Sequence, residues 1–211
     1  MSDSRTVMEI TEISNSRVRI LLDDGTGFVL YKGERRTYHL REGEQIGAEA
    51  YAEIMETVLP KRAKLRALNL LKARSYTKRQ LADKLRDGGY PEKILAQAIS
   101  YAASFGYVDD RQYALDFVEY NKEKRSRTWI FNALHRKGVP KEIIEDAWRE
   151  NASDGERERE REQILSWMHK KNFIASEATF AEKQKFCAFL YRKGFQIDAI
   201  QTALSLDIAS I

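Results

Sequence analysis

Few side chains in this sequence have the type and spacing that catalysis or metal binding requires. The chemically distinctive feature is instead a pair of segments rich in lysine and arginine. The three histidines, His39, His135 and His169, are isolated and match no metal-binding spacing such as HExxH or CxxC. The acidic pair Asp109-Asp110 could indicate a metal-dependent nuclease, but it lies after a glycine at a predicted helix start, where acidic residues cap the helix. No glycine-rich loop has the spacing of a phosphate cradle. The sequence therefore predicts no catalytic residue, no metal and no cofactor.

The positive charge is concentrated in two segments. Residues 61–86 contain ten basic residues and one acid, and residues 122–137 contain six basic residues and one acid. Solvated helix faces are often rich in lysine and arginine, but one acid among eleven charges is unusually lopsided. Lysine and arginine bind phosphates without reading a base sequence. We therefore predict a polyanionic partner.

The composition is that of a soluble protein. The 211 residues include 36 Lys+Arg and 32 Asp+Glu, which gives a formal net charge of +4. The longest apolar run, residues 186–191, is far shorter than the ~18 residues of a membrane span, and the N-terminus has no apolar stretch of signal-peptide length. The single cysteine, Cys187, has apolar neighbours that predict an inert core thiol. We expect a cytoplasmic protein that does not bind a membrane.

The first 45 residues predict a small antiparallel sheet. Apolar and polar residues alternate in residues 18–22, 28–30 and 38–40, and residues 23–27 supply the glycines of a tight hairpin. Three or four short strands bury only one face, so the sheet must pack on the next part of the chain. A helix is predicted there from about Ala48 to Leu59.

The rest of the chain contains an internal repeat. Residues 81–99, 130–148 and 186–204 align without a gap, with periods of 49 and 56 residues. Each block predicts a helix, a tight turn and a second helix, and an amphipathic helix precedes each block. The positions that coincide most clearly are the leucines Leu85, Leu134 and Leu190 and the turn glycines Gly89, Gly138 and Gly194.

Local signals refine the repeats. Thr77 and Gln80 have the spacing of a capping box. Acidic and basic residues alternate in residues 155–162, which predicts an exposed helical start and a candidate flexible joint before the third repeat. Trp148 occupies a repeated apolar position and is expected in the core, whereas Trp129 is expected to be exposed.

Together these patterns predict a mainly α protein. We expect three tandem three-helix repeats that form an elongated array, preceded by a small N-terminal antiparallel β region. The β region with its helix is placed at residues 1–59. The three repeats are placed at residues 60–108, 109–153 and 154–211.

The repeated block resembles the RecX family of recombination regulators over about residues 60–207. The resemblance rests on three motifs in order: ALNLLKARSYTKRQL at residues 67–81 with a following KL, FGYVDDRQYA at residues 105–114 and ALHRKGVPKEII at residues 133–144. The first two motifs are the more specific. The N-terminal strands look like the extension of longer members, and Gln196 stands where the other two repeats have proline.

The resemblance implies a non-catalytic regulator of DNA repair and of the SOS response. Such a protein binds RecA, or the RecA filament on single-stranded DNA, and inhibits strand exchange, ATP hydrolysis and coprotease activity. We expect RecA and single-stranded DNA of any sequence as partners of a monomer. The residues expected to bind them are chosen by charge alone: Arg74, Lys78, Arg79, Arg86, Lys124, Arg125, Arg127, Arg136 and Lys137.

Two other functions remain open. Three-helix units with a short glycine turn also describe helix-turn-helix domains, so the chain could be a sequence-specific DNA-binding protein. The spread of basic charge over whole repeats argues against a single recognition helix. A helical scaffold that binds only protein is the second alternative. Contacts to Z phosphates of a single strand make log K fall with log[salt] with a slope of about −0.7Z, whereas a steep sequence preference would favour the sequence-specific DNA-binding protein.

Overall fold

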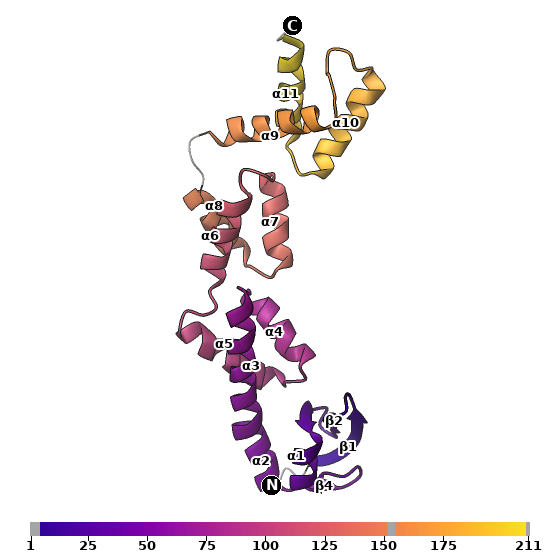
Figure 1. Ribbon diagram of the computed structural model, residues 1–211, viewed down its shortest axis with the longest axis vertical. Helices are drawn as coiled ribbons and strands as arrows, with labels where there is room; N and C mark the ends of the chain where they lie inside the picture. The colour runs from indigo at the N-terminus through magenta and orange to yellow at the C-terminus, as the bar shows by residue number, and fades with distance from the viewer. Residues whose placement is uncertain (1–4, 152–154, 210–211) are drawn as a thin grey trace. The chain divides into compact units, whose positions relative to one another are not determined.

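The computed structural model describes residues 5–151 and 155–209 of the chain. The chain divides into two compact units, Met1–Asp109 and Asp110–Ile211. Unit 1 contains a β-sheet and one three-helix domain, and unit 2 contains two further three-helix domains (Figure 1). Within the described ranges, every helix falls short of the length and apolar composition that a membrane-spanning segment needs.

Unit 1 begins with a four-stranded antiparallel sheet in the order β3-β2-β1-β4. Val18, Ile20 and Leu22 alternate into the core as predicted. The predicted strand at residues 38–40 is wrong, because the short helix α1 (Lys32–Thr37) directly precedes these residues and a turn follows it at residues 38–39. The strands are β1 (Arg5–Glu12), β2 (Arg17–Leu22), β3 (Gly27–Tyr31) and β4 (Gln45–Ile46).

A continuous helical run leads from the sheet into the first three-helix domain, where the sequence predicted two separate helices. It consists of α2 (Ala48–Glu53), the π-helical turn η1 (Ile54–Val58) and α3 (Leu59–Ala73). Pro60 lies in the first turn of α3 and has no amide hydrogen to donate. The π-helical turn before it shifts the hydrogen-bond register, with the Leu59 N–H donating to the Ile54 carbonyl, so the helix continues through the proline.

The first three-helix domain shares one hydrophobic core with the sheet. It consists of α3, α4 (Lys78–Asp87) and α5 (Glu92–Ser104) (Figure 1). The predicted capping box is confirmed: the Gln80 N–H donates to Thr77 Oγ1 at 3.2 Å, and the Thr77 N–H donates to Gln80 Oε1 at 3.2 Å. Phe28 of β3, Leu59 of α3 and Leu85 of α4 belong to the same core, so the sheet buries its apolar face against these helices.

Unit 2 contains the other two three-helix domains, each with its own core. The second domain consists of α6 (Asp110–Asn121), α7 (Arg127–Arg136) and α8 (Lys141–Asn151), and the third of α9 (Glu156–Lys170), α10 (Phe180–Arg192) and α11 (Ile197–Ala209). Trp148 is buried in the core of the second domain, as predicted. The predicted fold class, mainly α with three three-helix domains after a small antiparallel sheet, is confirmed.

Two of the repeated turn glycines pack closely against a preceding element of their own unit. Gly89 has φ +82 and Gly194 has φ +89, a conformation that favours glycine. A Cβ atom on Gly89 would collide with the Val29 side chain of β3. One on Gly194 would lie 2.7 Å from Ser126 Oγ, next to the start of α7. Both turns therefore need glycine for the backbone angle and for the close contact.

The segment of alternating charge forms the first turns of α9, as predicted, but its face is not fully exposed. Arg159 Nε pairs with a Glu123 carboxylate oxygen at 3.0 Å. The Glu160 carboxylate accepts the Gln196 N–H at 3.2 Å, and Gln163 Nε2 donates to the carbonyl of Lys122 at 2.7 Å. These bonds fix α9 to the second domain and to the turn before α11. The flexible joint expected in these same residues, 155–162, is instead the start of α9, and Asp154 before it lies outside the described residues.

Candidate functional site

Four of the nine basic residues predicted to bind a partner lie in unit 1. Arg74 follows α3 with an extended backbone, and its guanidinium lies 4.4 Å from the centroid of the Tyr76 ring. Lys78 and Arg79 are in the first turn of α4 and are exposed. These three cations therefore lie close together around the junction between α3 and α4.

Arg86, the fourth of these residues, has its charge compensated. Its Nε and Nη2 atoms donate to the Glu92 carboxylate at 2.6 and 3.3 Å, and Nη1 donates to Asp83 at 2.7 Å. The hydrogen bonds with Glu92 raise the pKa of Arg86, and Arg86 lowers the pKa of Glu92. Arg86 thus links the end of α4 to the start of α5, and less of its charge is left for an external anion.

The other five residues lie in unit 2, and two of them contact a row of stacked rings. The aromatic row consists of Tyr113 and Phe117 on α6 and Trp129 on α7. The Tyr113 and Phe117 centroids are 6.4 Å apart, and those of Phe117 and Trp129 are 6.2 Å apart with an interplanar angle of 9°. Trp129, expected to be exposed, is half-buried in this row. Lys137 Nζ lies 5.6 Å from the Phe117 centroid, and the Arg125 guanidinium lies 4.7 Å from that of Trp129.

The remaining cations of this group have different surroundings. Lys124 Nζ lies 4.0 Å from the centroid of Tyr120, whose ring is largely exposed. Arg127 lies 4.7 Å from the Phe131 centroid and also 4.0 Å from a Glu156 carboxylate oxygen. Arg136 is exposed in the last turn of α7.

An aromatic ring can position a cation without compensating its charge. A carboxylate that pairs with the cation compensates the charge, so the pair as a whole is neutral. Among the residues that the structure describes, Arg74, Lys124 and Arg125 each have a ring partner and no ion pair with a carboxylate. These three side chains therefore rest on rings, and no carboxylate of the described residues compensates their charge. That arrangement is suited to binding a polyanion.

The third domain repeats part of this arrangement, outside the two basic segments from which the candidate residues were chosen. Lys193 Nζ lies 5.1 Å from the centroid of Trp167 and 5.5 Å from that of Phe189. Lys193 directly precedes Gly194, just as Lys137 directly precedes Gly138. The sequence alignment of the repeats already places the two lysines in the same column, so this signal was present in the sequence.

The groups considered for catalysis are apart from one another. His39, His135 and His169 are all exposed. In residues 5–151 and 155–209 no three His, Cys, Asp or Glu side chains are grouped so that they could hold a metal ion. Cys187 packs against the core of the third domain, and burial raises the pKa of its thiol. The thiol therefore stays protonated at neutral pH, which agrees with an inert core cysteine.

Comparison with known proteins gives the same division into domains along the chain. The models of the RecX first, second and third three-helix domains match residues 63–101, 109–147 and 158–204. The regulatory protein RecX of Caldanaerobacter subterraneus subsp. tengcongensis is 36% identical over 168 residues, which cover 79% of this chain and 81% of that relative. The regulatory protein RecX of Clostridium botulinum is 26% identical over 206 residues, 93% of this chain and 92% of the relative.

Solved structures show the same fold. A crystal structure of regulatory protein RecX matches with a TM-score of 0.61 at 19% identity, over 94% of this chain and 98% of that one. The crystal structure of RecX from Lactobacillus salivarius matches with a TM-score of 0.58 at 22% identity, over 72% of this chain and 98% of that one. The curated relatives are named regulatory proteins, which confirms the prediction that the chain is not an enzyme. From the family models and these relatives, the chain belongs to the RecX family of regulatory proteins.

Proposed function

We propose that the chain is a non-catalytic regulator of DNA repair and recombination, which binds RecA or the RecA filament on single-stranded DNA. Binding inhibits the recombinase, ATPase and coprotease activities of RecA. Membership of the RecX family supports the choice of partner. The observation that supports the mode of binding is that Arg74, Lys124 and Arg125 are held on aromatic rings with their charge uncompensated.

The DNA within the filament is a polyanion. Single-stranded DNA presents a phosphate at every nucleotide, and cations that approach it release condensed counterions. This gain in free energy does not depend on the base sequence, which suits a regulator of a filament that forms on any DNA. Because a ring holds each cation in place, less side-chain entropy is lost when the phosphate binds.

The first test is RecA ATP hydrolysis on single-stranded DNA, with the chain titrated in at fixed, moderate salt. Binding of the chain to the same DNA without RecA is measured in parallel. We expect inhibition well below one copy of the chain per RecA protomer, which favours filament capping or disassembly over competition for DNA. Absence of inhibition, together with binding that depends on the DNA sequence, would instead support a helix-turn-helix repressor.

A second test uses charge reversal within unit 2. The double variant Arg125→Glu and Arg136→Glu removes two exposed cations, and we expect it to weaken inhibition while the helical circular dichroism stays unchanged. The control is Arg157→Glu, an exposed arginine in the first turn of α9 where an acidic residue suits the helix dipole. Arg157→Glu changes the net charge by half as much as the double variant, so a loss of binding free energy half as large would show that overall charge, and not this face, determines binding.

A further inference from the structure

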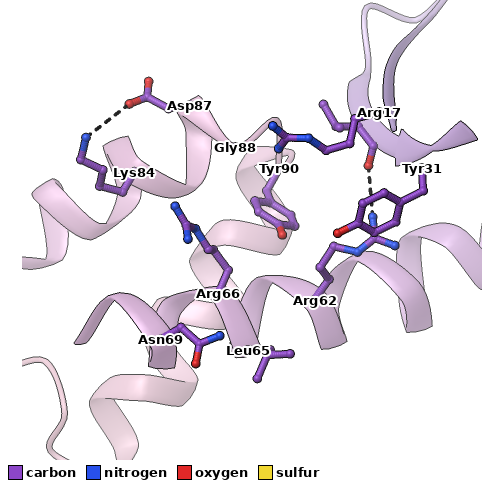
Figure 2. A pocket seen from close by; sticks show the side chains of 11 residues that line it. Arg17, Tyr31, Arg62, Leu65, Arg66, Asn69, Lys84, Asp87, Gly88 and Tyr90 are labelled. Carbon is purple, nitrogen blue, oxygen red and sulfur yellow. Dashed lines mark hydrogen bonds and ion pairs between the residues drawn. The ribbon is translucent and has the colours of Figure 1, made fainter. Parts of the chain in front are cut away.

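A cleft with a volume of about 590 Å³ lies between part of the sheet and the helices of the first three-helix domain in unit 1. Figure 2 shows the side chains that line it. One wall comes from β2 and β3, and the other comes from α3, α4 and the turn that follows α4. None of the nine basic residues chosen from the sequence lines it. The lining residues are Arg17, Val29, Tyr31, Arg62, Leu65, Arg66, Asn69, Lys84, Asp87, Gly88 and Tyr90.

The cleft is positively charged. Four cationic side chains and one carboxylate line it. Arg62 pairs with Glu34 of α1, and Lys84 is 4.0 Å from Asp87. Arg17 and Arg66 are exposed, and within the described part of the chain neither forms an ion pair with a carboxylate. Uncompensated cations that line a concave wall concentrate the positive potential and attract an anion.

Aromatic and apolar surface lies between these cations. Tyr31 is 46% exposed, and the Arg62 guanidinium lies 4.6 Å from the centroid of its ring. Tyr90 is half-buried between the two walls, with Arg66 on one side and Tyr31 on the other (Figure 2). Burial raises the pKa of the Tyr90 phenol, so its hydroxyl stays protonated and can donate a hydrogen bond. Leu65 adds an exposed apolar side chain to the floor.

The walls are held together before any ligand binds. The sheet and the helices share one core, and the Gly89 turn packs directly on Val29. Arg62 spans the two walls, because it bonds Glu34 as well as the carbonyl of Val29. A preformed cleft loses less entropy on binding than one that must close around its ligand. Its volume also lies within the range of roughly 300–1,000 Å³ found for ligand clefts.

We propose that this cleft binds a single strand of nucleic acid, with phosphates on Arg17, Arg66 and Lys84 and a base stacked on Tyr31. Cations alternating with exposed rings are the pattern that binds single strands without reading their sequence, because every base has a face that can stack. An acidic peptide would use the cations but would not stack on the exposed surface of Tyr31. This proposal rests on the proposed function in one respect: the nucleic acid is identified as single-stranded DNA.

The test measures binding of the full chain to a fluorescein-labelled oligothymidylate by fluorescence anisotropy over a range of salt concentrations. In Arg17→Glu and Arg66→Glu, each lost phosphate contact should make the negative slope of log K against log[salt] shallower by about 0.7. Lys61→Glu is the matched control, because Lys61 is an exposed residue of α3 that does not line the cleft. Its slope should equal that of the unaltered chain, and an equal change in all three variants would overturn the proposal.

The stacking contact is tested separately. Tyr31→Ala should weaken DNA binding roughly 5- to 150-fold, the range expected for one stacked base, while Tyr31→Phe should bind almost as the unaltered chain does. The same variants are then assayed for inhibition of RecA ATP hydrolysis. Unchanged DNA binding with intact RecA inhibition would refute the cleft proposal but leave the proposed function standing. Competition by polyglutamate without any effect of Tyr31→Ala would identify the cleft as a peptide site and would also refute it.

Discussion

Ser126 shows how one hydroxyl group can both start a helix and join two domains. It is buried, and its Oγ accepts the Trp129 N–H at 3.3 Å, which caps α7. The same hydroxyl donates to the carbonyl of Lys193 at 2.7 Å, in the turn between α10 and α11. Because its donor and its acceptor positions are both used, removing the hydroxyl leaves two backbone groups without their partner.

Ser126→Ala is therefore expected to destabilise unit 2 by about 1–2 kcal/mol, the cost of a lost cap together with an unsatisfied carbonyl. All three tryptophans lie in unit 2, at positions 129, 148 and 167, so the urea unfolding curve followed by tryptophan fluorescence reports on this unit. Ser166→Ala, on the exposed side of α9, is the control and should leave the midpoint unchanged. Equal midpoints for the two variants would contradict this role of Ser126.

Gly194→Ala tests the close contact on the other side of the same joint. An alanine there would be strained by the left-handed backbone, and its Cβ would lie 2.7 Å from Ser126 Oγ and 3.2 Å from the backbone nitrogen of Trp129. Gly155→Ala carries the backbone strain alone, because no atom of residues 5–151 or 155–209 lies within 4 Å of its Cβ. We expect Gly194→Ala to cost about 1–3 kcal/mol more than Gly155→Ala, the usual cost of overpacking. The free energies of unfolding in urea measure the difference, and equal values would rule out tight packing at this turn.

At the scale of elements, the sequence predicted those whose signals are local. The Thr77 capping box, the turn glycines and the apolar stripes of the repeats each lie within one or two helical turns, and all are present. The strand predicted at residues 38–40 rested on only two apolar positions. Glu34, whose carboxylate accepts the Tyr31 N–H at 2.8 Å, begins a helix just before that point. The predicted helix end at Leu59 is wrong, because a π-helical turn lets the helix continue through Pro60. No pattern of apolar residues reveals such a turn.

Contacts between distant residues could not be predicted in the same way. The alternating charges of α9 give no apolar stripe, and their partners are 36 to 41 positions away along the chain. The candidate site shows the same limit. Charge counting found Arg74 and Arg125 together with Arg86, but only the fold shows that Arg86 is paired with Glu92 across a turn. The cleft cation Arg17 lies in a strand outside both basic segments, so its sequence neighbours gave no signal.

The contact of α9 with the turn before α11 predicts a pH dependence for unit 2. Burial raises the pKa of Glu160 above its usual 4.5, although the Gln196 N–H that it accepts acts in the opposite direction. The folded state then holds the proton more tightly than the unfolded state does, so this carboxyl stabilises the fold fully below pH 4.5 and progressively less as the pH rises through the folded pKa.

Glu160→Gln keeps an acceptor for the Gln196 N–H and removes the titration. Relative to the unaltered chain, we expect the variant to be more stable at pH 7 and to lose this advantage by pH 4. Urea unfolding of both proteins at several pH values measures the difference. The exposed Glu162 on the same helix supplies the control, and Glu162→Gln should show no such trend. A stability difference that is constant with pH would contradict a raised pKa at Glu160.

At the scale of the whole molecule, the groups that we propose to bind DNA are present in both units. Unit 1 carries Arg74, Arg79 and the cleft with Arg17 and Arg66, and unit 2 carries the cations around the aromatic row. Two units on one chain that bind the same strand raise each other's effective concentration, because binding of the first makes binding of the second intramolecular. A regulator that acts on a long polymer gains affinity in this way without any additional contact.

DNA affinity should therefore depend on strand length. An oligothymidylate of roughly 5 nucleotides has room for one unit, whereas a strand several times longer can engage both. Affinity should then rise by about 100-fold or more with length, and the slope of log K against log[salt] should steepen by about 0.7 for each added phosphate contact. Arg136→Glu in unit 2 should weaken binding to the long strand strongly. On the short strand, the affinities of Arg66→Glu and Arg136→Glu should differ by much less than this loss. Anisotropy titrations with both strands measure these quantities, and a salt slope that is the same at every length would show that only one unit binds DNA.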